Sequence, residues 1–224
     1  MFRFTPSLNF KLYYGVAQII FMTPITPEEI KAILAKQGDV RGAVFQTDAN
    51  YILKVGSQND VLQVENQLKK WAIDLRYQEI KAMAWYPVAW RVLSLLAIKQ
   101  VLGWDNEQIR KMGQNAPKVS IIVKLFFKLF PDIEKFAQQI PHYWRKHYTA
   151  GDLNVVELNK NNQTMLLHLK DFSFHPVLCK YLEGYFEQAT KLTRPADAQV
   201  VCQETQCSFR DNTGYEAYQL KWTK

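Results

Sequence analysis

The chain has 224 residues, of which 48% are hydrophobic and 13% aromatic, with 28 Lys and Arg against 21 Asp and Glu. This length and composition are sufficient for the buried core of one domain, or of two lobes that share it, and they exclude an intrinsically disordered chain. The net charge of +7 favours acidic partners. Because no long run of basic residues accompanies that charge, we expect no specific binding of nucleic acid.

The cysteine count and the apolar runs bear on the compartment. Three cysteines, an odd number, indicate a reducing environment or thiols that act as ligands. The apolar run Leu12–Met22 contains Gln18 and is followed by no small-residue cleavage site, so we interpret it as folded structure rather than as a signal peptide. No run reaches the roughly 18 apolar residues that a membrane span requires. The sequence therefore predicts a cytoplasmic protein without a membrane span.

Residues 1–85 predict a small α/β lobe whose role the sequence leaves open. The motif Thr-Pro-Glu-Glu at 26–29 combines an N-cap, a first-turn proline and a capping-box glutamate, so a helix should run from Pro27 to about Lys36. A short strand is predicted over 42–47, and a second helix from Asn59 or Asp60 to Trp71. The segment 75–85 fits a strand or a helix.

The middle of the chain is predominantly helical. Capping residues and hydrophobic periodicity predict helices over 88–102, 105–113, 119–130 and 132–147. Pro141 should kink the last of these. The helix over 119–130 is apolar around most of its circumference, so another surface must cover it.

From Gly151 the hydrophobic period changes from 3.6 to 2, as the alternation of Met165, Leu167 and Leu169 indicates. Two hairpins, with strands at 153–158 and 163–169 and at 199–209 and 215–222, flank a helix from Pro176 to about Leu192. The predicted fold class is therefore α+β, or mixed α/β. A helical layer packs on a small antiparallel sheet made of two hairpins separated by a helix, and this domain over 86–224 follows the N-terminal α/β lobe.

Two motifs in this last third resemble those of a known family. They are Pro176-Val-x-Cys179-x-Tyr-x-x-Gly184-Tyr on the helix and Glu204-x-x-Cys207-x-Phe-Arg-Asp-x-x-Gly-Tyr-Glu216 in the second hairpin. Both are similar to the 4-vinyl reductase domain, whose superfamily also contains haem–nitric-oxide-binding domains and subunits of the vesicle-tethering transport protein particle. The resemblance covers about residues 86–224. It implies a prokaryotic, non-enzymatic sensor domain that binds a small hydrophobic or aromatic ligand between helices and sheet.

The resemblance also implies a structural zinc site. In the sensor relatives a helix Cys, a strand Glu, a Cys three residues later and a Cys across the following turn hold the metal. Cys179, Glu204 and Cys207 match the first three, but Tyr215 stands at the fourth position, and structural zinc takes four ligands. On a regular strand Glu204 and Cys207 face opposite sides, so only a bulge or twist would bring them together.

The simpler interpretation is that all three cysteines, including Cys202, are buried small hydrophobic side chains, and we weigh it ahead of zinc. The haem-binding branch implies a helix histidine and a Tyr-x-Ser-x-Arg signature. That signature is absent, and the histidines, at positions 142, 147, 168 and 175, have no metal-ligand spacing. The sequence therefore predicts no haem. No strong catalytic motif appears either, which argues against an enzyme.

Aromatic residues near the junction of helix and hairpin suggest where a ligand would bind. We predict a pocket lined by Tyr143, Trp144, Tyr148, His168, Phe172, Tyr181 and Tyr185, since aromatic side chains combine apolar faces with hydrogen-bond donors. The alternative is that they only pack in the core. A competing function is a protein-interaction or tethering module that forms a homodimer through the 119–130 helix or binds a partner protein. A tetrapyrrole-related reductase ranks last, because no motif for a redox cofactor is present.

Overall fold

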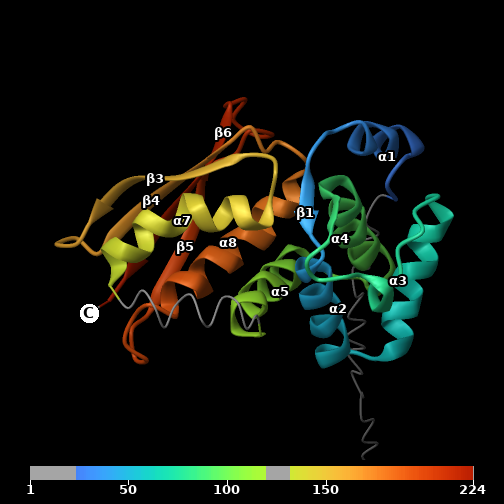
Figure 1. The fold of residues 1–224 in the computed structure, drawn as a ribbon, viewed down its shortest axis with the longest axis horizontal. Helices are drawn as coiled ribbons and strands as arrows, with labels where there is room; N and C mark the ends of the chain where they lie inside the picture. Colours follow the sequence, from blue (N-terminus) through green and yellow to red (C-terminus); the bar gives the residue numbers. More distant parts are fainter. Residues whose placement is uncertain (1–23, 120–131, 224) are drawn as a thin grey trace, which may run out of the picture.

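The computed structural model describes residues 24–119 and 132–223. The apolar run over 12–22 lies outside these ranges, and so does the predicted 119–130 helix apart from Val119. Within them, helices pack on two small antiparallel sheets, which confirms the α+β fold class (Figure 1). Among the described helices, none has the length and apolar content that crossing a membrane requires.

The N-terminal part contains more helix than the sequence indicated. Its elements are α1 (Pro27–Leu34), β1 (Asp39–Arg41), α2 (Ala43–Val55), α3 (Gln58–Lys70), the 3-10 turn η1 (Tyr77–Glu79) and β2 (Trp85–Pro87). The capping box predicted for α1 is present, with Thr26 and Glu29 bonded to each other's backbone amides. The cap of α3 is Ser57 rather than Asn59, because Ser57 and Asp60 form a second capping box.

The strand predicted over 42–47 is wrong, since these residues begin α2. Phe45, Ala49 and Ile52 are buried on this helix, a spacing of four and three residues that places them on one face. The run 43–47 contains Val, Phe and Thr, which favour strands locally, and burial of the helical face outweighs that preference. β1 is only three residues long, ends at Arg41 before the helix cap Gly42, and pairs with β2.

In the middle of the chain, α4 (Val88–Leu102) ends as predicted at Gly103, which adopts a left-handed conformation with φ of 67°. Helix α5 (Asn106–Val119) continues through Gly113, where the sequence suggested an end. Helix α7 (Ile133–His147) runs through Pro141 without a break, so the residues on both sides of the proline belong to one helix.

The C-terminal half matches the predicted order of two hairpins around a helix. Its elements are β3 (Asp152–Asn159), β4 (Thr164–Lys170), α8 (Pro176–Lys191), β5 (Val200–Gln206) and β6 (Tyr215–Trp222). The strands form one antiparallel sheet in the order β3-β4-β6-β5. Met165, Leu167 and Leu169 are buried on β4, as the alternation predicted.

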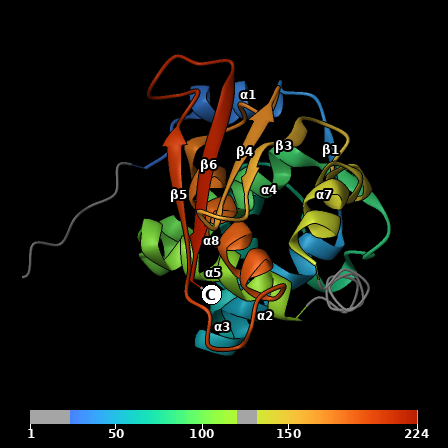
Figure 2. The same cartoon turned by 90° about the vertical axis from the view of Figure 1, so that its left-hand side faces the viewer.

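The helices cover one face of this sheet. Helix α7 packs on β3 and α8 on β5 and β6, while α5 packs on α8, so that α8 lies between the sheet and α5 (Figures 1 and 2). A single cluster of buried side chains extends from Ile33 to Trp222. The pairing of β1 with β2 spans the proposed division near residue 85, which remains a prediction.

The crossing of α5 and α8 brings the two helix backbones into direct contact at two glycines. A Cβ atom added at Gly113 would lie 2.0 Å from the carbonyl oxygen of Tyr181. A Cβ atom added at Gly184 would lie 2.0 Å from the carbonyl oxygen of Arg110. Because both neighbouring atoms belong to backbone, a side chain at either position would force the helices apart.

We therefore expect Gly113→Ala and Gly184→Ala each to lower the free energy of unfolding by about 3 kcal/mol or more, measured by urea denaturation. Gly214→Ala is the matched control, because an added Cβ there meets no atom within 4 Å. Equal urea midpoints for all three variants would show that the helices do not cross at these glycines.

Candidate ligand pocket and metal-binding cluster

A mostly apolar pocket lies between α2, α7 and α8. The space between its side chains amounts to about 910 Å³, part of which is open to solvent. Most of that space is narrow, since only about 80 Å³ of it can hold the centre of a water molecule. The lining consists of Ala43, Val44, Thr47, Arg91, Ala116, Phe136, Ile140, Tyr143, Trp144, His147, Tyr148, Leu153, Leu167, Tyr181, Leu182, Tyr185, Phe186, Ala189 and Thr190. A narrow, apolar space of this kind fits a small hydrophobic molecule.

The structure brings five of the seven predicted pocket residues together, namely Tyr143, Trp144, Tyr148, Tyr181 and Tyr185. The other two lie elsewhere. His168 stacks on Tyr215, with ring centroids 4.4 Å apart, in a partly exposed position on β4. Phe172 is buried behind the lining and packs edge-on against Trp144 at 5.0 Å.

The C-terminal end of α7 supplies an ordered aromatic wall. The indole Nε1 of Trp144 donates to the carbonyl oxygens of Ala150 and Gly151, at 3.1 Å and 3.0 Å. The Trp144 ring stacks on Tyr148 with centroids 4.3 Å apart. Since the indole donor is already satisfied, Trp144 presents only an apolar surface to the pocket.

Sequence reasoning missed a buried charged network beside the pocket. Arg91 on α4 is 1% exposed and Asp48 on α2 is fully buried. The Nε atom of Arg91 lies 3.4 Å from Oδ2 of Asp48, and the Tyr181 hydroxyl donates to Oδ1 at 2.9 Å. Nη1 of Arg91 donates to the Tyr148 hydroxyl, and the guanidinium lies over the Tyr181 ring at 4.2 Å. These contacts join α2, α4 and α8 to Tyr148, the residue that caps α7.

The network keeps Arg91 charged. Burial by itself lowers the pKa of the guanidinium. Tyr148 and Asp48 together raise that pKa by more than burial lowers it, so the pKa of Arg91 lies above the ordinary value. Burial also raises the pKa of Asp48, against the lowering effect of Arg91 and Tyr181. The sequence did carry one signal for this site, because Arg91 is the only charged residue in the stretch 88–98, where Ser94 is the only other polar one.

One histidine lines the pocket. The Nδ1 atom of His147 lies 3.3 Å from the carbonyl oxygen of Tyr143, four residues earlier on α7. Burial lowers the pKa of His147, and the Tyr143 carbonyl offsets that only in part, so the ring is neutral near neutral pH. If Nδ1 carries the proton and donates to the carbonyl, Nε2 is free to accept or to bind a metal. His142 is exposed, and His175 caps α8.

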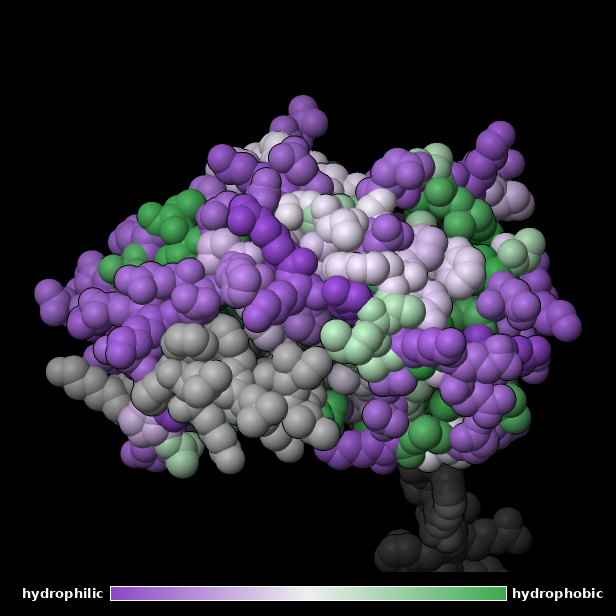
Figure 3. Space-filling view, in the orientation of Figure 1, coloured by the Kyte–Doolittle hydropathy of each residue, from purple (hydrophilic) through white to green (hydrophobic). Residues whose placement is uncertain are grey.

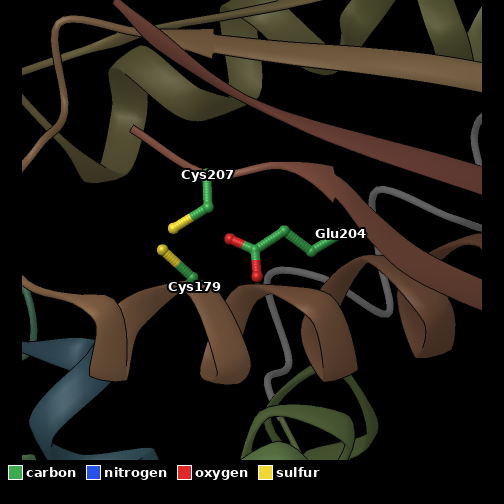
Figure 4. Close-up of side chains that lie close together, drawn as sticks. All are labelled: Cys179, Glu204 and Cys207. Carbon is green, nitrogen blue, oxygen red and sulfur yellow. The ribbon is translucent and has the colours of Figure 1, made fainter. Parts of the chain in front are cut away.

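The three predicted metal ligands lie together on the other side of α8. The side chains of Cys179, Glu204 and Cys207 converge, with one ligand atom from each within 4.8 Å of the others, and all three residues are buried (Figure 4). A register shift between Glu204 and Gln206 breaks the alternation of β5. The bulge therefore turns Glu204 and Cys207 to the same side, as the zinc interpretation required.

The carboxylate of Glu204 is only half satisfied. Its Oε2 atom lies 3.5 Å from Nζ of Lys180 and 4.0 Å from Nη1 of Arg210. Its Oε1 atom is buried without a hydrogen-bond partner among the described residues. A buried carboxylate oxygen facing two sulfur atoms is a setting in which a cation would be stabilised.

The fourth position of the resemblance does not reach this cluster, since Tyr215 stacks on His168 instead. Glu216, the next residue on β6, is buried, and its charge acts on Cys179. Cys202 is buried but does not belong to the cluster. Burial of all three cysteines is what both the zinc and the core-packing interpretations require, so it does not choose between them.

Comparison with known proteins finds no matching family model and no matching curated protein. The fold is similar to that of H-NOX domains. An H-NOX protein from S. oneidensis in the Fe(II)NO ligation state matches with a TM-score of 0.63 and 14% identity, covering 82% of this chain and 99% of that one. The Fe(II) unliganded H-NOX protein from K. algicida gives 0.57 and 9%, covering 82% and 97%.

These matches confirm that the fold resembles that of H-NOX domains. Identity this low shows the fold alone, and membership of the 4-vinyl reductase family is not shown.

The exclusion of haem made from the sequence is wrong. The solved structures that share this fold include H-NOX proteins in Fe(II) states and one used to probe heme distortion. The exclusion rested on a missing signature and on histidine spacing. The tertiary structure decides which histidine reaches a pocket, and here His147 lines one. A porphyrin would still require the lining side chains to move, because the pocket is narrow.

The half-buried position of His147 predicts acid sensitivity. Its pKa in the folded chain lies below the ordinary value of 6.5, so the unfolded chain takes up the proton more readily. The contribution of the neutral ring to stability is therefore present above pH 6.5 and is lost as the pH falls below that value. We expect His147→Gln to reduce the fall in Tm between about pH 7.5 and about pH 5. The exposed His142→Gln variant, melted at the same two pH values, should keep the wild-type fall.

Proposed function

We propose that this chain is a small-molecule-binding sensor domain whose ligand occupies the pocket between α2, α7 and α8. The observation that carries the proposal is the pocket itself, which is apolar, walled by aromatic rings and bordered by one buried charged network. The fold supports the proposal, since the H-NOX structures that share it include one with NO bound at Fe(II). The resemblance to the 4-vinyl reductase domain remains a prediction consistent with this role.

The described surface gives less support to the alternative, a protein-interaction module. On the face in Figure 3, hydrophobic residues form small separate patches among hydrophilic ones. Exposed large hydrophobic side chains such as Leu62, Met83 and Val201 come from different elements. The helix proposed to form a homodimer lies almost entirely outside the described residues. A homodimer and a partner protein therefore remain predictions, which subunit counting by native mass spectrometry would test.

Filling the mouth of the pocket should abolish ligand binding. Val44 lies on α2, is partly exposed and lines the pocket, so Val44→Trp would place an indole in the binding space with little disturbance of the core. We expect the affinity for 2-naphthol, measured by isothermal titration calorimetry, to fall by about tenfold or more. Leu53→Trp is the matched control, because Leu53 lies on the same helix, is 43% exposed and does not line the pocket. Equal affinities for the two variants would place the binding site elsewhere.

Haem is one candidate ligand of this pocket. His147 would hold the iron. Arg91 would supply a positive charge at the pocket wall. Bound haem would supply an iron atom able to take a gaseous ligand. The experiment is an absorption spectrum of the purified protein with and without added haemin. A Soret band that His147→Ala removes, and that His142→Ala leaves, would support haem.

We also propose that Cys179, Glu204 and Cys207 bind zinc as a structural site, with a further ligand completing the tetrahedron. Support comes from the convergence of the three donors and from the unpartnered Oε1 atom of Glu204. Sulfur and carboxylate donors are an accepted ligand set for zinc, which prefers four ligands. Such a site would tie the first turn of α8 to the end of β5.

Zinc content measured by inductively coupled plasma mass spectrometry should be about one ion per chain for the wild type and near zero for Cys179→Ser and Cys207→Ser. Tm should fall in the same two variants. Cys202→Ser is the matched control, being a buried cysteine on β5 outside the cluster, and should keep its zinc. If the wild-type protein contains no zinc after growth in medium with added zinc, the zinc proposal is wrong. The three cysteines are then buried side chains that pack in the core.

A further inference from the structure

The geometry points to a ligand class: an apolar molecule with a single carboxylate, which Arg91 binds inside the pocket. This inference rests on the proposed function, since it requires that the pocket between α2, α7 and α8 is the binding site. It adds the chemistry of the ligand's polar end and the residue that selects it.

The donor capacity of Arg91 is largely unused. A guanidinium carries five N–H donors in a planar fork that suits a carboxylate. Nε reaches Asp48 at 3.4 Å, longer than a good charge-assisted hydrogen bond, and Nη1 donates to the Tyr148 hydroxyl. The Nη2 atom is buried and has no partner among the described residues. A buried donor left without an acceptor costs free energy, which a bound acceptor would recover.

Asp48 does not fill this role. One of its oxygens faces Nε of Arg91, and the other accepts the Tyr181 hydroxyl proton. Neither Nη1, which donates to Tyr148, nor Nη2, which has no partner among the described residues, is therefore used by the Asp48 carboxylate. Repulsion from Asp48 would also keep a second carboxylate away from Nε, toward the end of the guanidinium that carries Nη1 and Nη2.

A second donor lies next to the first. The Tyr148 hydroxyl oxygen accepts from Nη1 of Arg91, so its own proton is available to an acceptor. Both Arg91 and Tyr148 line the pocket. A carboxylate with one oxygen on Nη2 and the other on the Tyr148 hydroxyl would satisfy both groups, with Nη1 bridging them.

The rest of the pocket defines the body of the ligand. Side chains such as Ile140, Leu182 and Phe186 form its walls, and Trp144 has already used its donor. The narrow space favours one aromatic ring system or a short acyl chain over a branched or polar molecule. Arg91 is fully buried and held by Asp48 and the Tyr181 ring, so it is oriented before a ligand arrives.

The test compares two carboxylic acids, one aromatic and one with an acyl chain, each with its own neutral amide. The probes are 2-naphthoate and 2-naphthamide, and octanoate and octanamide, titrated by calorimetry into the wild type and two variants. Arg91→Lys keeps the charge and loses the fork. Arg91→Met with Asp48→Asn removes both charges together, so that neither is left buried alone if the single variant unfolds. Arg76→Lys is the control, since Arg76 pairs with Glu65 away from the pocket.

We expect the wild type and the Arg76→Lys control to bind at least one acid about tenfold or more tightly than its amide, and both Arg91 variants to bind that acid and its amide about equally. Equal binding of acid and amide by the wild type, or a preference that survives in both variants, would overturn it and leave the sensor proposal intact. Failure of every probe to bind, with no ligand retained in a native mass spectrum, would overturn the proposed function and this inference with it.

Discussion

The backbone contact between α5 and α8 at Gly113 and Gly184 is the constraint on which both candidate sites depend. It sets the depth at which α8 lies between α5 and the sheet. Tyr181 and Tyr185, on either side of Gly184, then reach the pocket, while Cys179 faces the end of β5. A wider helix crossing would move all three side chains together, because they share one rigid element.

Helix α8 therefore separates an apolar site from a polar one. Toward the pocket, Tyr181 bonds to a buried ion pair that Arg91 of α4 forms with Asp48 of α2, and Arg91 also donates to Tyr148 at the end of α7. Such a pair contributes little net stability, because removing two charges from water costs about as much as their attraction returns. Its value here lies in orientation, as it holds a cation at the wall of an otherwise apolar space. The residues before 85 take part in this, since α2 supplies Asp48 and one side of the pocket.

The likeness to H-NOX domains concerns the fold and leaves the function open. The chain shares the architecture of proteins solved with Fe(II), at identities near one residue in seven or lower. A fold of this kind positions a pocket between helices and a sheet, and the side chains that line it decide what binds there. In this chain they are a neutral histidine, an arginine and several aromatic rings. Because pocket residues come from elements far apart in the chain, the absence of a sequence signature could not by itself exclude haem.

The sequence by itself determined the local features of the second half: the helix caps, the strand alternation of Met165, Leu167 and Leu169, and the order of hairpin, helix and hairpin. These depend on short-range chemistry, which periodicity and capping residues report directly. The tertiary structure alone decided that 43–47 is helix, because burial of Phe45 against distant elements outweighed its local preference. It alone placed Arg91 against Asp48 and turned Glu204 toward the two cysteines through a bulge, since contacts between residues tens of positions apart leave no periodic trace in the chain.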